Sequence, residues 1–82
     1  MHYVYVLVSK RYRRWHYYGC TSDLKRRIDE HVAGTVRSTR HYRPLHLLYY
    51  EAYISSDLAK QRERQLKSSR SASAALLARM LV

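Results

Sequence analysis

The chain has 82 residues and a formal net charge of +10, from 16 Lys and Arg against 6 Asp and Glu. This length favours a single small domain, and a hydrophobic content of 46% excludes a disordered chain. The one cysteine excludes an internal disulfide and is typical of a cytoplasmic protein, and no apolar run reaches the roughly 20 residues that span a bilayer, so we expect no membrane partner.

The N-terminal part of the chain predicts two strands followed by a helix. Residues 3–8 are β-branched or aromatic on both faces, which indicates a central strand covered on both sides. Residues 16–20 predict a second strand, and the short basic connector between the two favours an antiparallel hairpin. Residues 21–23 supply N-cap chemistry for a helix that runs to about Ala33 and ends at Gly34.

The rest of the chain begins with a basic loop, residues 34–44. It then predicts one strand and two helices, over residues 45–53, 58–67 and 72–82. The resulting order is β-β-α-β-α-α. This order predicts an α+β fold, a small three-stranded sheet flanked by helices, in one domain over residues 1–82.

The first predicted helix places two polar side chains on the stripe that packs on the sheet. The stripe carries Leu24, Arg27, Ile28 and His31, which lie at positions i, i+3, i+4 and i+7. A charge on such a stripe is costly unless it is paired or functional. Arg27 is therefore a candidate functional residue, and the alternative is an arginine whose head reaches past the core edge to solvent.

The second predicted helix also directs a polar residue inward. Glu63 lies between Ala59 and Leu66, at spacings of four and three residues. The alternative is an ordinary surface ion pair between Glu63 and Lys67, four residues on.

Five polar side chains are thus expected to share one concave site: Tyr5, Tyr17, Arg27, His31 and Glu63. A carboxylate is the oxygen ligand that suits Mg²⁺, and the ion would polarise a phosphoryl oxygen. Arg27 would neutralise charge on a scissile phosphate. A phenol would position or deprotonate the attacking water, and a nearby arginine and a metal-bound water would favour its ionised form, since its unperturbed pKa is about 10.

Four short motifs carry a resemblance to a known family. They are Tyr3-Val4-Tyr5, Tyr17-Tyr18-Gly19, Asp23-Leu24-Lys25-Arg26-Arg27 with His31 one turn on, and Arg62-Glu63-Arg64-Gln65-Leu66-Lys67. In this order and spacing they resemble the GIY-YIG nuclease superfamily over residues 3–67, in the form of a small stand-alone member. The resemblance also covers a loop segment, Ser38-Thr39-Arg40 with Arg43-Pro44.

The resemblance implies a role for each residue of the site. Tyr5 and Tyr17 would surround the attacking water, Arg27 would contact the phosphate, and His31 would lie near the leaving group or the water. Glu63 would hold a divalent metal, Mg²⁺ or Mn²⁺. The first motif keeps only its final Tyr, and Cys20 stands where some repair members carry Lys. No counterpart of the late Asn of some members is present after the Glu63 helix.

The expected function is that of a metal-dependent endonuclease that hydrolyses phosphodiester bonds in nucleic acid. DNA is favoured over RNA as the partner, in repair or recombination, and the oligomeric state is left open. The residues expected to bind nucleic acid are Arg26, Arg37, Ser38, Thr39, Arg40 and Arg43.

Two other functions fit the charge. A non-catalytic nucleic-acid-binding module would use the same basic residues, but a lone carboxylate at Glu63 would repel phosphate and so favours the metal site. A structural RNA protein is disfavoured because the chain has no long basic tail. Trp15, at the end of the basic connector, is expected to anchor the connector by packing, with stacking on a base as the alternative.

Overall fold

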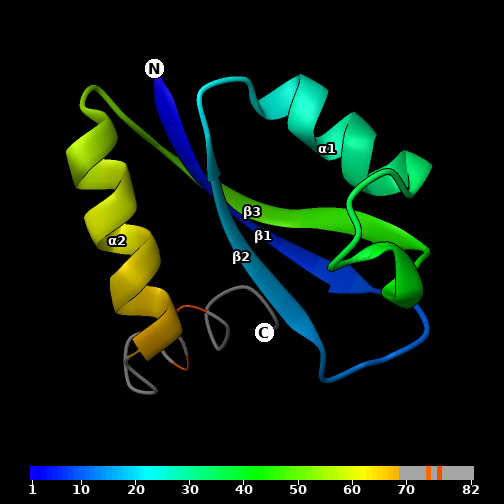
Figure 1. Ribbon diagram of the computed structural model, residues 1–82. Helices are drawn as coiled ribbons and strands as arrows, with labels where there is room; N and C mark the ends of the chain where they lie inside the picture. The colour runs from blue at the N-terminus through cyan, green and yellow to red at the C-terminus, as the bar shows by residue number, and fades with distance from the viewer. Residues whose placement is uncertain (69–73, 75, 77–82) are drawn as a thin grey trace.

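The structure is a computed structural model that describes residues 1–68 together with Ala74 and Leu76. The elements follow in the order β1 (His2–Ser9), β2 (His16–Thr21), α1 (Leu24–Ala33), the 3-10 turn η1 (Arg40–Tyr42), β3 (Leu45–Tyr53) and α2 (Ser56–Ser68) (Figure 1). This confirms the predicted α+β fold through its second helix. Of the predicted third helix, only Ala74 and Leu76 are described, both helical, and its other residues lie outside the described part of the chain.

The three strands form an antiparallel sheet in the order β2-β1-β3, with β1 at the centre. The predicted hairpin pairs Tyr5 with Gly19 and Leu7 with Tyr17. On the other side of β1 the register shifts between Val6 and Leu7. The first two predicted motifs thus lie on adjacent strands, where directly opposed residues point to the same face.

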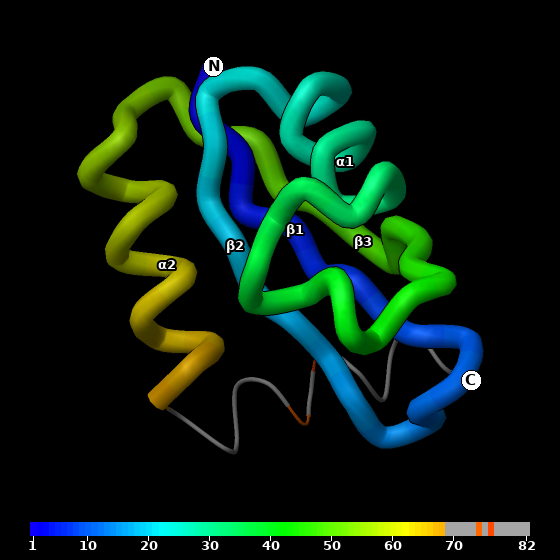
Figure 2. Tube along the Cα trace, turned by 45° about the vertical axis from the view of Figure 1, so that its right-hand side comes forward, coloured from blue at the N-terminus to red at the C-terminus, as the bar shows by residue number. Residues whose placement is uncertain are grey.

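Side chains of β1 alternate between two cores, as a central strand requires. Val4 and Val6 pack with Ala59 and Leu66 of α2, while Tyr5 and its neighbours on the opposite face pack under α1. The two helices therefore cover opposite faces of the sheet (Figure 2). No helix among the described residues is long and apolar enough to cross a membrane.

The ends of α1 are fixed by its sequence. The Asp23 side chain accepts a hydrogen bond of 3.1 Å from the Arg26 amide, which satisfies one of the free donors of the first turn. At the other end, Gly34 has a φ of 84°, and its amide donates to the carbonyls of Glu30 and His31. A left-handed residue of this kind strongly favours glycine. Both predicted ends of the helix are confirmed.

A half-buried carboxylate joins α2 to β3. Glu51 accepts hydrogen bonds from the hydroxyls of Tyr49 and Tyr53, at 2.9 and 2.6 Å. The Arg62 guanidinium donates to both of its oxygens, at 2.9 and 3.1 Å. Burial acts to raise the pKa of Glu51, but Arg62 and the two hydroxyls outweigh it and hold the pKa below its usual value. Because the pair is bidentate and largely shielded, it fixes how α2 sits against the sheet.

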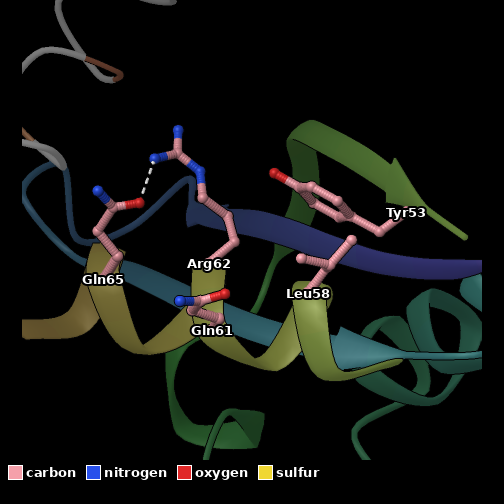
Figure 3. A pocket seen from close by; sticks show the side chains of 5 residues that line it. All are labelled: Tyr53, Leu58, Gln61, Arg62 and Gln65. Carbon is pink, nitrogen blue, oxygen red and sulfur yellow. Dashed lines mark hydrogen bonds between the residues drawn. The ribbon is translucent and has the colours of Figure 1, made fainter. Parts of the chain in front are cut away.

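Arg62 also borders a hollow of about 390 Å³ between α2 and the end of β3 (Figure 3). Its second partner there is Gln65, whose side-chain oxygen accepts from Arg62 Nη1 at 2.9 Å. The rest of the lining consists of Tyr53, Leu58 and Gln61. None of the five predicted catalytic side chains lines this hollow.

Replacing Arg62 with Met should lower the free energy of unfolding by about 2 kcal/mol, because it leaves the shielded Glu51 carboxylate without its cation. Urea denaturation measures the change. Arg64→Met is the matched control, since Arg64 is exposed on the same helix, and it should change the value by less than about 0.5 kcal/mol. Equal effects of the two substitutions would contradict a structural role for the Glu51 pair.

Candidate active site

The side chain of Tyr5 crosses the neighbouring strand at a glycine. Tyr5 is opposite Gly19, and a Cβ added at residue 19 would collide with Cζ and Oη of Tyr5. The glycine of the second motif is thus required because the phenol occupies the space that a side chain would take. Tyr5 is 1% exposed, and its ring centroid lies 6.3 Å from that of Tyr17. The sheet itself brings the two predicted tyrosines together.

A chain of hydrogen bonds runs from Tyr5 into the protein. Its hydroxyl lies 2.9 Å from His31 Nε2, and His31 Nδ1 lies 2.7 Å from the hydroxyl of Thr39. His31 and Thr39 are both 0% exposed. One strand, one helix and the loop after it therefore meet at a single imidazole, which also lies 5.2 Å from the Tyr17 ring.

Burial controls the protonation of this chain. It lowers the pKa of His31 to about 4, with Arg27 acting in the same direction and Glu30 opposing. His31 is therefore a neutral imidazole near pH 7, with one nitrogen donating and the other accepting. Burial also raises the pKa of Tyr5 to about 12, and Arg27 opposes this rise without cancelling it. The neighbouring arginine favours the ionised phenol, as expected, but desolvation of Tyr5 by burial outweighs it.

Arg27 lies on the stripe of α1 that was predicted, at the border between the core and solvent. Its side chain is 38% exposed, and Nη1 donates to Glu30 at 3.0 Å. The effects on pKa show that its guanidinium acts on both Tyr5 and His31. A part of the guanidinium thus remains accessible to solvent.

Glu63 lies on α2, the helix that covers the face of the sheet opposite to Tyr5 and α1. Its side chain is 22% exposed, and its carboxylate contributes to the raised pKa values of Tyr5 and Cys20. Glu63 lines an open hollow of about 590 Å³. The other residues of this lining are His2, Cys20, Thr21, Ser22, Ser56 and Lys60. The lone carboxylate thus faces a space that a phosphate group and an ion can enter.

The ion pair of Glu63 with Lys67, which was the alternative to a functional Glu63, is present but long. The Nζ···Oε2 distance is 3.9 Å, and the Lys67 side chain is 51% exposed. Such a pair contributes little to stability. Lys67 Nζ also lies 5.9 Å from the Tyr17 ring centroid, so this lysine connects the carboxylate with the second tyrosine. The spacing of Glu63 and Lys67 in the sequence indicated their ion pair. It could not indicate the contact of Lys67 with Tyr17, because that contact joins α2 to β2.

The surroundings of Glu63 fit a hard divalent ion bound by few protein ligands. Within residues 1–68, Ala74 and Leu76, no three His, Cys, Asp or Glu side chains come close enough to form a metal-binding cluster. Mg²⁺ commonly keeps several waters and takes one or two carboxylates together with substrate phosphate oxygens. One carboxylate beside an open hollow is compatible with that mode of binding, and it does not suit a four-ligand zinc site.

The residues predicted to bind nucleic acid fall into two groups. Arg26, Arg37, Ser38 and Arg40 are exposed. Thr39 is instead buried, with its hydroxyl against His31. Arg43 is exposed, but its guanidinium donates to the carbonyls of Arg40 and Ala33, at 3.1 and 3.3 Å. Thr39 and Arg43 therefore hold the loop to α1, a structural use that the loop sequence alone did not reveal.

Comparison with known proteins shows which family and fold the chain resembles. The family model described as the GIY-YIG catalytic domain matches residues 1–75. A UPF0213 protein from Natronomonas pharaonis is 40% identical over 68 residues, which cover 82% of this chain and 78% of that protein. One from Haloquadratum walsbyi is 35% identical, with 82% and 74% covered. The solution NMR structure of a UPF0213 protein from Bacillus halodurans is similar with a TM-score of 0.58 and 34% identity, over 94% of this chain and 82% of that one.

The buried imidazole predicts a pH dependence of stability. Because the pKa of His31 is about 4 when folded and about 6.5 when unfolded, the unfolded chain binds more protons between these values. The free energy of unfolding should therefore fall as the pH is lowered from 6.5 towards 4. Denaturation at several pH values measures this, and His31→Asn should show a smaller dependence. An imidazole NMR signal of His31 that titrates near pH 6.5 would refute the assignment.

Replacing Gly19 with Ala should displace the Tyr5 phenol, because the added methyl group occupies its place. The expected result is a folded protein in which His31 loses its contact with the Tyr5 hydroxyl, seen as a change in the imidazole nitrogen shifts by NMR. Gly19→Ala in a Tyr5→Phe background is the control, because there is no hydroxyl left to move. Unchanged shifts in the single variant would show that the ring packs differently.

Proposed function

This chain belongs to the GIY-YIG catalytic domain family, a nuclease family, and we propose that it is a metal-dependent endonuclease that hydrolyses phosphodiester bonds in DNA. The support for the proposal is that Tyr5 and Tyr17 lie beside each other on two strands, while Arg27 of α1 and Glu63 of α2 both influence the pKa of the Tyr5 phenol. A stable fold has no need to couple two phenols, a cation and a carboxylate from four separate elements.

The charges of Arg27 and Glu63 determine the role that each side chain has in the proposed reaction. Arg27 binds a non-bridging oxygen of the scissile phosphate, and its planar guanidinium compensates negative charge that grows in the transition state. Glu63 is the group that would hold Mg²⁺ or Mn²⁺, and a bound ion supplies polarisation of the phosphoryl oxygen and stabilises the leaving oxygen. The hollow beside Glu63 gives an ion and a phosphate access to this carboxylate, and Arg27 is reached from solvent through its partly exposed side chain.

Tyr5 acts as a neutral hydrogen-bonding group that orients the attacking water. A pKa of about 12 leaves the phenol protonated at pH 7. Passing its proton to His31 would create an imidazolium, which a pKa of about 4 disfavours. The Tyr5 and His31 pair therefore fixes the position of the hydroxyl. Positioning the attacking water is a sufficient role for the Tyr5 hydroxyl, because phosphoryl transfer depends mainly on alignment of the reacting groups and on electrostatic stabilisation.

Cleavage assays with the Glu63→Gln and Arg27→Lys variants test the proposal. The substrates are labelled duplex, branched and single-stranded DNA and RNA, each with Mg²⁺, with Mn²⁺ and with chelator. Both variants should lose about 100-fold or more in kcat, because one loses the metal ligand and the other the planar fork at the phosphate. Asp57→Asn is the matched control, since it removes an exposed carboxylate from the same helix and should leave kcat unchanged.

The opposite outcome identifies the second candidate function. A protein that cuts none of these substrates but binds DNA equally well as wild type, Glu63→Gln and Arg27→Lys is a binding module. The salt dependence of that binding would then come from other cations.

A further inference from the structure

Two basic segments that are far apart in the sequence are joined at one end of the sheet. They are the connector 10–15 between β1 and β2 and the loop 34–44 between α1 and β3 (Figure 2). Ser9 Oγ donates to the carbonyl of Tyr42 at 2.6 Å and accepts from two connector amides at 3.1 Å. A backbone hydrogen bond of 2.9 Å also joins the start of the connector to the end of the loop. Because Ser9 is 6% exposed, water does not compete for these bonds.

Aromatic rings reinforce the joint. Trp15 stacks on Tyr42 with centroids 4.3 Å apart and an interplanar angle of 13°, and it also stacks on Tyr17 at 6.2 Å. Tyr12 stacks on His41 at 6.0 Å. Trp15 is therefore a packing anchor between the connector and the loop, as expected, and these contacts already occupy its ring. The stack also ties both segments to a tyrosine of the candidate active site.

The joined segments present cations without acidic neighbours in the sequence. We call them the basic platform, defined as Lys10, Arg11, Arg13, Arg14, Arg37 and Arg40, all of which are exposed. Residues 1–22 and 31–50 contain no Asp or Glu. Every ion pair found in the described part of the chain involves other cations, on α1 or α2. The charge of the platform is thus left for an external anion.

We propose that the basic platform binds the phosphate backbone of a duplex arm of the nucleic acid, next to the site of cleavage. This inference rests on the proposed function and names the form of its substrate. A rigid array of guanidinium groups on two segments suits the closely spaced phosphates of a duplex. A surface for unpaired bases would instead need free aromatic faces for stacking. Here the rings are stacked on each other, so the platform contacts the backbone and reads no sequence.

Binding measured in chelator separates the platform from catalysis. Arg13→Gln/Arg14→Gln removes two platform charges and keeps their aliphatic stems. Its affinity for a blunt duplex should fall at least about tenfold at low salt, and the slope of log affinity against log salt should decrease by about 1.8, because two phosphate contacts are lost. Affinity for a single strand of the same sequence should change less than about twofold.

The matched control is Lys25→Gln/Arg64→Gln, which removes the same net charge from exposed positions on α1 and α2. It should leave duplex affinity within about twofold of wild type. A control that lowers duplex affinity as much as the platform variant would overturn the proposal, because it would show a response to net charge alone. A larger loss for the single strand than for the duplex would overturn it as well.

Ser9→Ala tests whether the two segments act together, since it keeps every cation and removes the side-chain hydrogen bonds of Ser9, so that only the Lys10 to Pro44 backbone bond and the ring contacts still join the segments. Weaker duplex binding by the folded variant supports one platform, and unchanged binding contradicts it. If Ser9→Ala does not fold, the Arg13 and Arg14 variant decides alone. Duplex binding with the expected slopes but without any cleavage would refute the endonuclease and leave the platform standing.

Discussion

The contact of the Tyr5 hydroxyl with His31, and of His31 with Thr39, is the interaction on which the site depends. It is buried, and it joins β1, α1 and the loop after α1 at one imidazole. A neutral imidazole has one donor and one acceptor, so it satisfies one hydroxyl on each side. Among the described residues, no buried side-chain polar atom lacks a partner. The polar chain is thus tolerated in the core because it is complete.

The burial that fixes the geometry of this polar chain also sets the protonation states of Tyr5 and His31. Removing Tyr5 from water raises its pKa, and removing His31 lowers its pKa. Both groups are held neutral, in the form that costs least to bury. Such a site is organised for alignment and for receiving charge from outside. Its charged members, Arg27 and Glu63, lie at its border, where a phosphate and a cation can reach them.

The sequence was sufficient to predict the elements because their signals are local. The Asp23 cap, the Gly34 stop and the apolar β1 each depend on neighbouring residues. The inward stripe with Arg27 and His31 was predictable for the same reason. The roles of Thr39 and Ser9 were not, since their partners lie 8 and 33 residues away and depend on how the loop returns to the sheet. The raised pKa of Tyr5 was missed because burial, unlike spacing, is a property of the assembled fold.

The position of Glu63 depends on a contact outside the site. Its helix is attached to the sheet through Arg62, the preceding residue, which points to the other side of α2 and binds Glu51 with both arms of its guanidinium. Adjacent helical residues face about 100° apart, so a helix fixed by Arg62 also has a fixed direction for Glu63. A rotation of α2 about its axis that moved the Glu63 carboxylate away from Tyr5 would break the Glu51 pair. The carboxylate proposed to hold the ion is therefore oriented by a second carboxylate that never meets the substrate.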